Sequence, residues 1–161
     1  TLSPVSRYVL KEYIATSHQD IYTNGQLRLM IVCKETGEPV GTIDLFDLDP
    51  HHRRCGVGIL IDPDSRRKGF AGEALLLVLA YAFSFLKLKQ VYAHVPVNNH
   101  PSVALFTRSG FKITGRLSQI RTVGFFAYKA GCFDQSLFAC CFRSVYVRKT
   151  TKGFTQKIAG A

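Results

Sequence analysis

The chain has 161 residues, 47% of them apolar and 20% charged, which is enough material for one globular domain with a sizeable core. This composition excludes a disordered chain, a collagen-like chain and a small scaffold held together by disulfides. The net charge of +10 is unevenly distributed, because residues 112–161 carry nine basic side chains and a single acid, Asp134. Such a basic region is typical either of a solvated surface or of a site that attracts nucleic acid or anionic lipid.

The first half of the chain is expected to form a helix followed by three strands. Apolar residues at helical spacing predict a helix from Val5 to Ala15. Leu27 to Cys33 and Val40 to Leu48 have the composition of strands and are separated by a Glu-Thr-Gly-Glu turn, which predicts a hairpin. Arg54 to Asp62 is rich in Val, Ile and Leu and predicts a third strand, ended by an Asp-Pro-Asp sequence.

The middle of the chain alternates between helix and strand signals. A basic loop with glycines, Ser65 to Gly72, precedes the apolar stretch Glu73 to Leu86, which is too short for a membrane helix and predicts a buried one. Gln90 to Val97 predicts a strand. A short helix from Asn99, a favourable cap, to Gly110 follows, and Phe111 to Thr114 then predicts another strand.

The last third of the chain gives weaker signals. Gln119 to Tyr128 and Gln135 to Val147 are expected to pair as a final hairpin. The order of elements, with strands before and after one central helix, predicts an α/β (α+β layered) domain. One domain is expected to span residues 1–138, and residues 139–161 are expected to add a final strand and a basic C-terminal extension. The helix Glu73 to Leu86 is apolar nearly all round, so either the N-terminal helix or a second subunit of a homodimer is expected to cover it.

The basic loop is a candidate phosphate-binding site. Arg66-Arg67-Lys68-Gly69-Phe70-Ala71-Gly72 leaves a strand and opens a helix, where free backbone N–H groups and the helix dipole favour an anion. The glycines let the backbone approach closely, and the basic side chains supply charge for more than one phosphate. The loop matches neither the Walker nor the dinucleotide-binding glycine pattern. By itself it is equally well explained as a helix start with surface charges.

A second motif follows the next predicted strand. It reads Asn99-x-x-Ser102-x-x-Leu105-Phe106-x-x-x-Gly110-Phe111. Together with the loop, which fits Q/R-x-x-G-x-G/A through Arg66, Gly69 and Ala71, it makes the sequence resemble the GNAT superfamily of acyl-CoA N-acyltransferases, in the branch of ribosomal-protein N-terminal and spermidine acetyltransferases. The resemblance covers about Ile31 to Thr114 and, more loosely, Gly131 to Phe138.

The resemblance implies a mixed, mostly antiparallel central sheet that is flanked by helices and splayed open near its middle. Acetyl-CoA would be the co-substrate in the opening, and no metal is expected. Main-chain groups of Ile59, Leu60 and Ile61 would pair with the pantetheine arm, as an extended chain adds to a strand edge. The pyrophosphate would be wrapped by Arg66, Arg67, Lys68, Gly69, Phe70, Ala71 and Gly72. Asn99 and Phe106 would complete the cofactor site, although Asn99 is also explained as a helix cap. Relatives begin with a strand and a helix that would precede Leu27, so the chain is expected to enter the fold late.

The chemistry implied by the resemblance is direct acetyl transfer to a primary amine. This reaction needs an unprotonated amine, a polarised carbonyl group and a proton for the departing CoA thiolate. Many relatives supply that proton from a Tyr at the position of Phe106, which has none to give. Ser102 is therefore the candidate catalytic residue, and a backbone-bonding role in the first helical turn is the alternative. The candidate bases and amine-binding groups, each also explained as a solvated polar residue, are Asp44, Asp47, Asp49, His51, His52 and His94.

The leading hypothesis is an acetyl-CoA-dependent N-acetyltransferase that acts on a small-molecule or peptide amine, either a polyamine or a protein N-terminus. One alternative is a CoA-binding module with little turnover, and another is an RNA- or ribosome-associated protein acting through the basic C-terminus. No membrane partner is expected. The chain starts without a basic-then-apolar leader, and its five cysteines form no C-x-x-C pair. These features predict a cytoplasmic protein with reduced thiols, without a disulfide framework or a zinc site.

Overall fold

The computed structural model describes residues 20–117, 123–129, 145–149 and 157–158, together with Ser6 and Tyr8. Apart from these last two residues, the helix predicted at residues 5–15 lies outside the described part of the chain. The first element that the structure describes in full is a short helix, α2 (Ile21–Asn24). It begins at Asp20, whose carboxylate accepts two backbone N–H groups, and ends at Gly25 in the left-handed conformation.

Three strands follow as the sequence predicts. β1 (Leu27–Cys33) and β2 (Pro39–Asp49) form an antiparallel hairpin, and β3 (Arg54–Ile61) pairs antiparallel with β2. Successive side chains of a strand point to opposite faces of the sheet. One face of these strands is almost fully buried and includes Leu29, Ile31, Ile43, Leu45 and Val57. The core of the domain therefore lies on this face.

Helix α3 (Phe70–Ala80) covers the buried face and contacts β1, β2 and β3. Its sheet-facing side chains are buried and include Ala74, Leu75, Val78 and Leu79. The helix begins at Phe70 rather than at the predicted Glu73, because Gly69 adopts a left-handed conformation with φ 89° and serves as the N-cap. It continues into a π-helical turn, η2 (Tyr81–Phe85).

The next elements confirm the predicted strand–helix–strand order. They are β4 (Gln90–Pro96), α4 (His100–Arg108) and β5 (Lys112–Leu117). β6 (Val123–Lys129) then inserts between β4 and β5 and pairs antiparallel with both. An aromatic cluster joins α4 to this part of the sheet, with ring centroids 5.0 to 6.2 Å apart, and is made of Phe106, Phe111, Phe126 and Tyr128.

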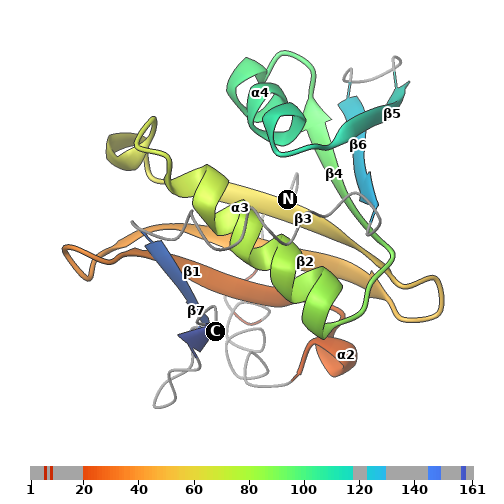
Figure 1. Ribbon diagram of the computed structural model, residues 1–161, viewed down its shortest axis with the longest axis horizontal. Coiled ribbons are helices and arrows are strands. Elements are labelled where there is room, and N and C mark those ends of the chain that lie inside the picture. The colour runs from red at the N-terminus through yellow and green to blue at the C-terminus, as the bar shows by residue number, and fades with distance from the viewer. Residues whose placement is uncertain are drawn as a thin grey trace.

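The sheet is completed by β7 (Val145–Lys149), which pairs antiparallel with β1 and with β8 (Lys157–Ile158). Within the described residues the sheet has eight strands in the order β5-β6-β4-β3-β2-β1-β7-β8, and the pair β3–β4 is parallel. Figure 1 shows α3 crossing one face of this sheet and α4 beside the end of β4. The mixed, mostly antiparallel sheet flanked by helices confirms the predicted fold class.

The predicted final hairpin is wrong, because β6 and β7 lie on opposite sides of the sheet with four strands between them. β6 completes the hydrogen bonding of β4 and β5. β7 instead buries Val145 and Val147 next to β1 and α3. β6 thus pairs with the preceding strand β5 and with β4, whereas β7 pairs with β1, which is distant in sequence.

Candidate active site

The sheet opens between β3 and β4. These parallel strands pair only at Arg54 with Gln90, Cys55 with Val91 and Gly56 with Tyr92. Beyond Gly56 the two strands diverge, as Figure 1 shows, and β4 follows its other neighbour β6 over its whole length. The splayed sheet that the sequence resemblance implied is therefore present. The facing edge of β3 pairs with no other strand of the described residues after Gly56, so alternate backbone N–H and C=O groups are directed into the opening.

Three residues expected to bind the cofactor lie on this edge. Ile59 and Ile61 are partly buried and pack against the core, whereas the side chain of Leu60 points to the opposite face and is 65% exposed. A strand rises about 3.3 Å per residue, so the edge from Gly56 to Ile61 is about 17 Å long. It can pair with an extended amide-bearing chain along this length.

The basic loop follows directly at the end of β3. Asp62 caps a short 3₁₀ helix, η1 (Pro63–Ser65), and the guanidinium of Arg66 donates from Nε to the carbonyl oxygen of Ile61 at 3.2 Å. Arg66 and the next two basic residues are exposed, so their charge lies at the N-terminal end of α3, where the helix dipole also favours an anion.

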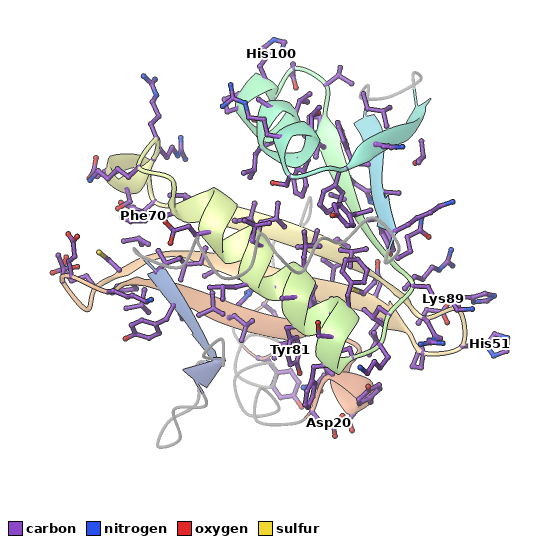
Figure 2. The ribbon with its side chains drawn as sticks, in the orientation of Figure 1. Asp20, His51, Phe70, Tyr81, Lys89 and His100 are labelled. Atoms are coloured by element: carbon purple, nitrogen blue, oxygen red, sulfur yellow. The ribbon has the colours of Figure 1, made fainter. Side chains whose placement is uncertain are left out.

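The backbone of the loop has an unusual conformation that leaves space in front of it. Arg67 and Gly69 both have positive φ, 61° and 89°, and backbone turns of this kind can form a concave anion site with their N–H groups. A Cβ atom placed on Gly69 or Gly72 would meet no atom within 4 Å. Phe70 and Ala71 are half-buried in the first turn of α3. Figure 2 labels Phe70 and His100, the first residues of α3 and α4, which lie on the two arms of the opening.

The second motif forms the start of α4. Asn99 is its N-cap, and Oδ1 of Asn99 accepts a hydrogen bond from the backbone N–H of Ser102 at 3.2 Å. Ser102 itself is half-buried. Phe106 is only 3% exposed, and its ring packs in the aromatic cluster, 5.0 Å from the ring of Phe111. The motif thus positions the helix through its cap and anchors it through Phe106.

Most of the candidate acids of the β2–β3 hairpin are engaged within the hairpin region. Asp44 forms a bidentate ion pair with Arg28 across β1 and β2, with both N–O distances 2.8 Å. Asp49 accepts hydrogen bonds from the backbone and the ring of His52, at 2.9 and 2.7 Å. These bonds hold the pKa of the Asp49 carboxyl below its usual value. Figure 2 shows His51 at the tip of the hairpin, at the end of the sheet remote from Phe70.

One group of side chains was not singled out as a unit from the sequence. Tyr92 is the last residue of β4 that pairs with β3, and its hydroxyl donates to Oδ2 of Asp47 at 3.5 Å. The Tyr92 ring lies edge-on to Phe46, with centroids 6.2 Å apart, and 5.2 Å from the ring of His94. Burial, followed by the charge of Asp47, raises the pKa of Tyr92. The alternation that places Tyr92 and His94 on one face of β4 is the sequence signal for this group.

The order and spacing of these elements agree with a known protein family. Residues 3–112 match the family model of the acetyltransferase (GNAT) domain. The chain belongs to the GNAT family.

Known GNAT proteins resemble this chain in sequence and in fold. Spermidine N(1)-acetyltransferase of Escherichia coli is 30% identical over 97 residues, which are 60% of this chain and 51% of the relative. The N-acetyltransferase YoaA of Bacillus subtilis is 38% identical over 93 residues, 58% of this chain and 52% of the relative. The crystal structure of Vibrio cholerae spermidine N-acetyltransferase with CoA and spermine has a TM-score of 0.70 at 26% identity, covering 80% of this chain and 78% of that one. The chain spans about half the length of the curated relatives it matches.

The described part of this GNAT domain contains no group of three or more His, Cys, Asp and Glu residues that could hold a metal ion. Within the same residues, no helix is long and apolar enough to cross a membrane. Cys33 and Cys55 are both buried and form no disulfide. Burial raises the pKa of the Cys55 thiol to about 12, so this thiol is not a nucleophile at neutral pH.

Proposed function

We propose that the protein is an N-acetyltransferase that transfers an acetyl group directly from acetyl-CoA to a primary amine. The observation that carries this proposal is the opening between β3 and β4, which leads from the paired residues at Gly56 to a basic loop at the start of α3. An edge of free backbone groups next to a concave anion site fits a ligand with an amide-bearing arm and a pyrophosphate. The GNAT relative from Vibrio cholerae, solved with CoA and spermine, supports the same ligand class.

In this proposal, the backbone at Ile59, Leu60 and Ile61 binds the pantetheine arm. The pyrophosphate is bound by the backbone of the basic loop, and the charges of Arg66, Arg67 and Lys68 strengthen that contact. Gly69, Phe70, Ala71 and Gly72 form the wall behind it. Asn99 acts as the cap that fixes the second arm of the opening, and Phe106 supports this arm from the core.

In the chemical step the unprotonated amine nitrogen attacks the thioester carbonyl carbon, and the carbon–sulfur bond then breaks. The nitrogen releases one proton to water as the amide forms, and the group that protonates the thiolate regains its proton from water. A backbone N–H of β3 directed into the opening is the natural donor to the developing oxyanion. The thiolate then takes a proton. Ser102 is the proposed donor, because it lies half-buried in the first turn of α4, whereas the ring of Phe106 has no proton to give.

The acceptor class follows from the relatives. The names of the Escherichia coli and Vibrio cholerae proteins specify spermidine, which favours a polyamine over a protein N-terminus for this chain. Amine-dependent release of free thiol from acetyl-CoA tests this choice. Release that stays at the level without amine would support the CoA-binding module with little turnover instead.

We also propose a cytoplasmic location, which the free thiols of Cys33 and Cys55 support.

The division of the chain into residues 1–138 and 139–161 is likewise a proposal, and β7, in the second part, pairs with β1 of the first. A homodimer that covers the exposed ring of Phe85 in η2 would be detected by sedimentation. A role of the basic C-terminus in RNA binding would require an affinity that falls with salt.

A matched pair of glycine variants tests the cofactor site. Gly69 and Gly37 both have positive φ, and a Cβ atom on either would meet no atom within 4 Å. Gly69→Glu places a negative side chain in the anion site, whereas Gly37→Glu makes the same change in the turn between β1 and β2. Acetyl-CoA at 100 times its Kd stabilises the folded protein by about 2.7 kcal/mol, or about 5–10 °C in Tm for a domain of this size. We expect the shift to persist in Gly37→Glu and to disappear in Gly69→Glu. An equal shift in both variants would contradict the proposed site.

A further inference from the structure

Phe46, Asp47 and Tyr92 form a connected group on the face of the sheet opposite α3, at the point where β3 and β4 separate. We propose that this group is an ammonium-binding site, in which the carboxylate of Asp47 binds a second, non-reacting ammonium group of the acceptor and so selects a diamine or polyamine over a monoamine. This inference rests on the proposed acetyltransferase function, because it assigns the acceptor side of the same opening.

The rings of Phe46 and Tyr92 lie next to a part of β3 that has only glycines on this face. Gly56 and Gly58 are separated by one residue, so the positions of their absent side chains lie on the same face of the strand. The ring of Phe46, from β2, lies against Gly56 and is 3.6 Å from the Cβ position of Gly58. Tyr92 approaches from β4, and the two rings meet edge to face. Aromatic faces attract organic cations, so this surface suits an alkylammonium chain.

Asp47 supplies the negative charge next to these rings. β2 and β3 lose their regular register between Phe46 and Asp49, and irregularities of this kind redirect side chains beside functional sites. Asp47 also has a positive φ of 50°, a conformation that Asp tolerates better than most residues. The Tyr92 hydroxyl, which like any ordinary tyrosine is protonated at neutral pH, donates to the carboxylate and orients it.

The position of Asp47 indicates which nitrogen it binds. The reacting nitrogen must reach the opening between β3 and β4, where the free edge of β3 begins at Gly56. Asp47 lies on β2, one to two strand spacings away, which is about 5–10 Å. The carboxylate itself extends toward β4, where it lies 3.5 Å from the Tyr92 hydroxyl, so it can bind an amine at the other end of a short alkyl chain while the reacting nitrogen lies in the opening. Asp44 and Asp49, in contrast, already have basic partners in Arg28 and His52.

The test compares 1,4-diaminobutane with butylamine, which differ by one ammonium group. Asp47→Asn removes the charge but keeps the shape, and Glu35→Gln removes one negative charge from the exposed turn between β1 and β2 as a matched control. The contact is exposed to solvent, so an ion pair is worth about fivefold in kcat/KM. We expect Asp47→Asn to lower kcat/KM for the diamine by about that factor, through KM, and to leave butylamine unchanged. Glu35→Gln is expected to change neither value, and Tyr92→Phe to raise KM for the diamine with an unchanged kcat.

Binding of the same two amines to the CoA complex, measured by calorimetry, separates this inference from the proposed function. A wild-type protein that binds the diamine more tightly than butylamine, and loses that preference in Asp47→Asn, supports the site even if no acetyl transfer is detected. Absence of acetyl transfer with every amine would reject the proposed function alone. An unchanged preference in Asp47→Asn, or an equal loss for both amines, would overturn the assignment of Asp47.

Discussion

Replacement of Gly56 by alanine perturbs the contact between β3 and the ring of Phe46. A Cβ atom on Gly56 would lie against Cε2 of that ring, 2.5 Å from Cζ and 2.8 Å from Cδ2. These distances are well inside van der Waals contact, so the ring must move or the strands must separate. The same substitution at Gly58 places the new atom 3.6 Å from Cε1, an ordinary contact. The two variants therefore differ in packing while sharing their strand, their face and their change in composition.

The size of the difference follows from two terms. Both substitutions restrict the unfolded chain and stabilise the protein by about 0.4–1 kcal/mol. Only Gly56→Ala adds an overpacking cost, of about 1–3 kcal/mol. The difference in free energy of unfolding between the variants is then about 1–3 kcal/mol, which corresponds to Tm values about 2–12 °C apart. Urea denaturation of both variants measures it, and equal midpoints would refute the argument that Phe46 occupies the space above Gly56.

Two further predictions concern buried side chains. The Cys55 thiol has a pKa of about 12, so only a fraction of about 10⁻⁴ is thiolate at pH 8. We expect N-ethylmaleimide to modify Cys55 only after unfolding, as measured by peptide mass spectrometry. Rapid modification of Cys55 in the native protein would contradict its burial. Phe106→Tyr places a hydroxyl in the buried aromatic cluster, so we expect the free energy of unfolding to fall by about 1–3 kcal/mol and kcat not to rise. A higher kcat would instead show that the ring at this position contacts the substrate.

The elements that the sequence predicted correctly are those specified by neighbouring residues. The hairpin of β1 and β2 follows from two strand-like segments around a short turn, and α4 follows from its cap Asn99 and its stop at Gly110. The basic loop between β3 and α3 was recognisable because glycines and basic residues stand together between a strand and a helix. These signals are local, so no knowledge of the tertiary structure was needed to read them.

The positions of β6 and β7 could not be predicted in this way. Each is a short apolar segment that fits the edge of several strands, and the choice depends on which apolar face is left uncovered in the folded sheet. β6 meets β4 and β5, and β7 meets β1 beneath α3. The pairing of Tyr92 with Asp47 is likewise non-local, because it joins β4 to β2 across β3. Identifying that site required the sheet order.

The glycines of β3 connect the stability of the sheet with the proposed acceptor site. Glycine within a strand is less stable than alanine by about 0.5–1 kcal/mol, and β3 contains two on one face. The Phe46 ring occupies the space above them, so apolar burial offsets part of this cost. A larger side chain at position 56 would fill the same space from within β3, but it would displace Phe46 from its contact with Tyr92. The aromatic surface that Phe46 of β2 and Tyr92 of β4 form, with Asp47 at its edge, therefore requires glycines on this face of β3, the strand between them.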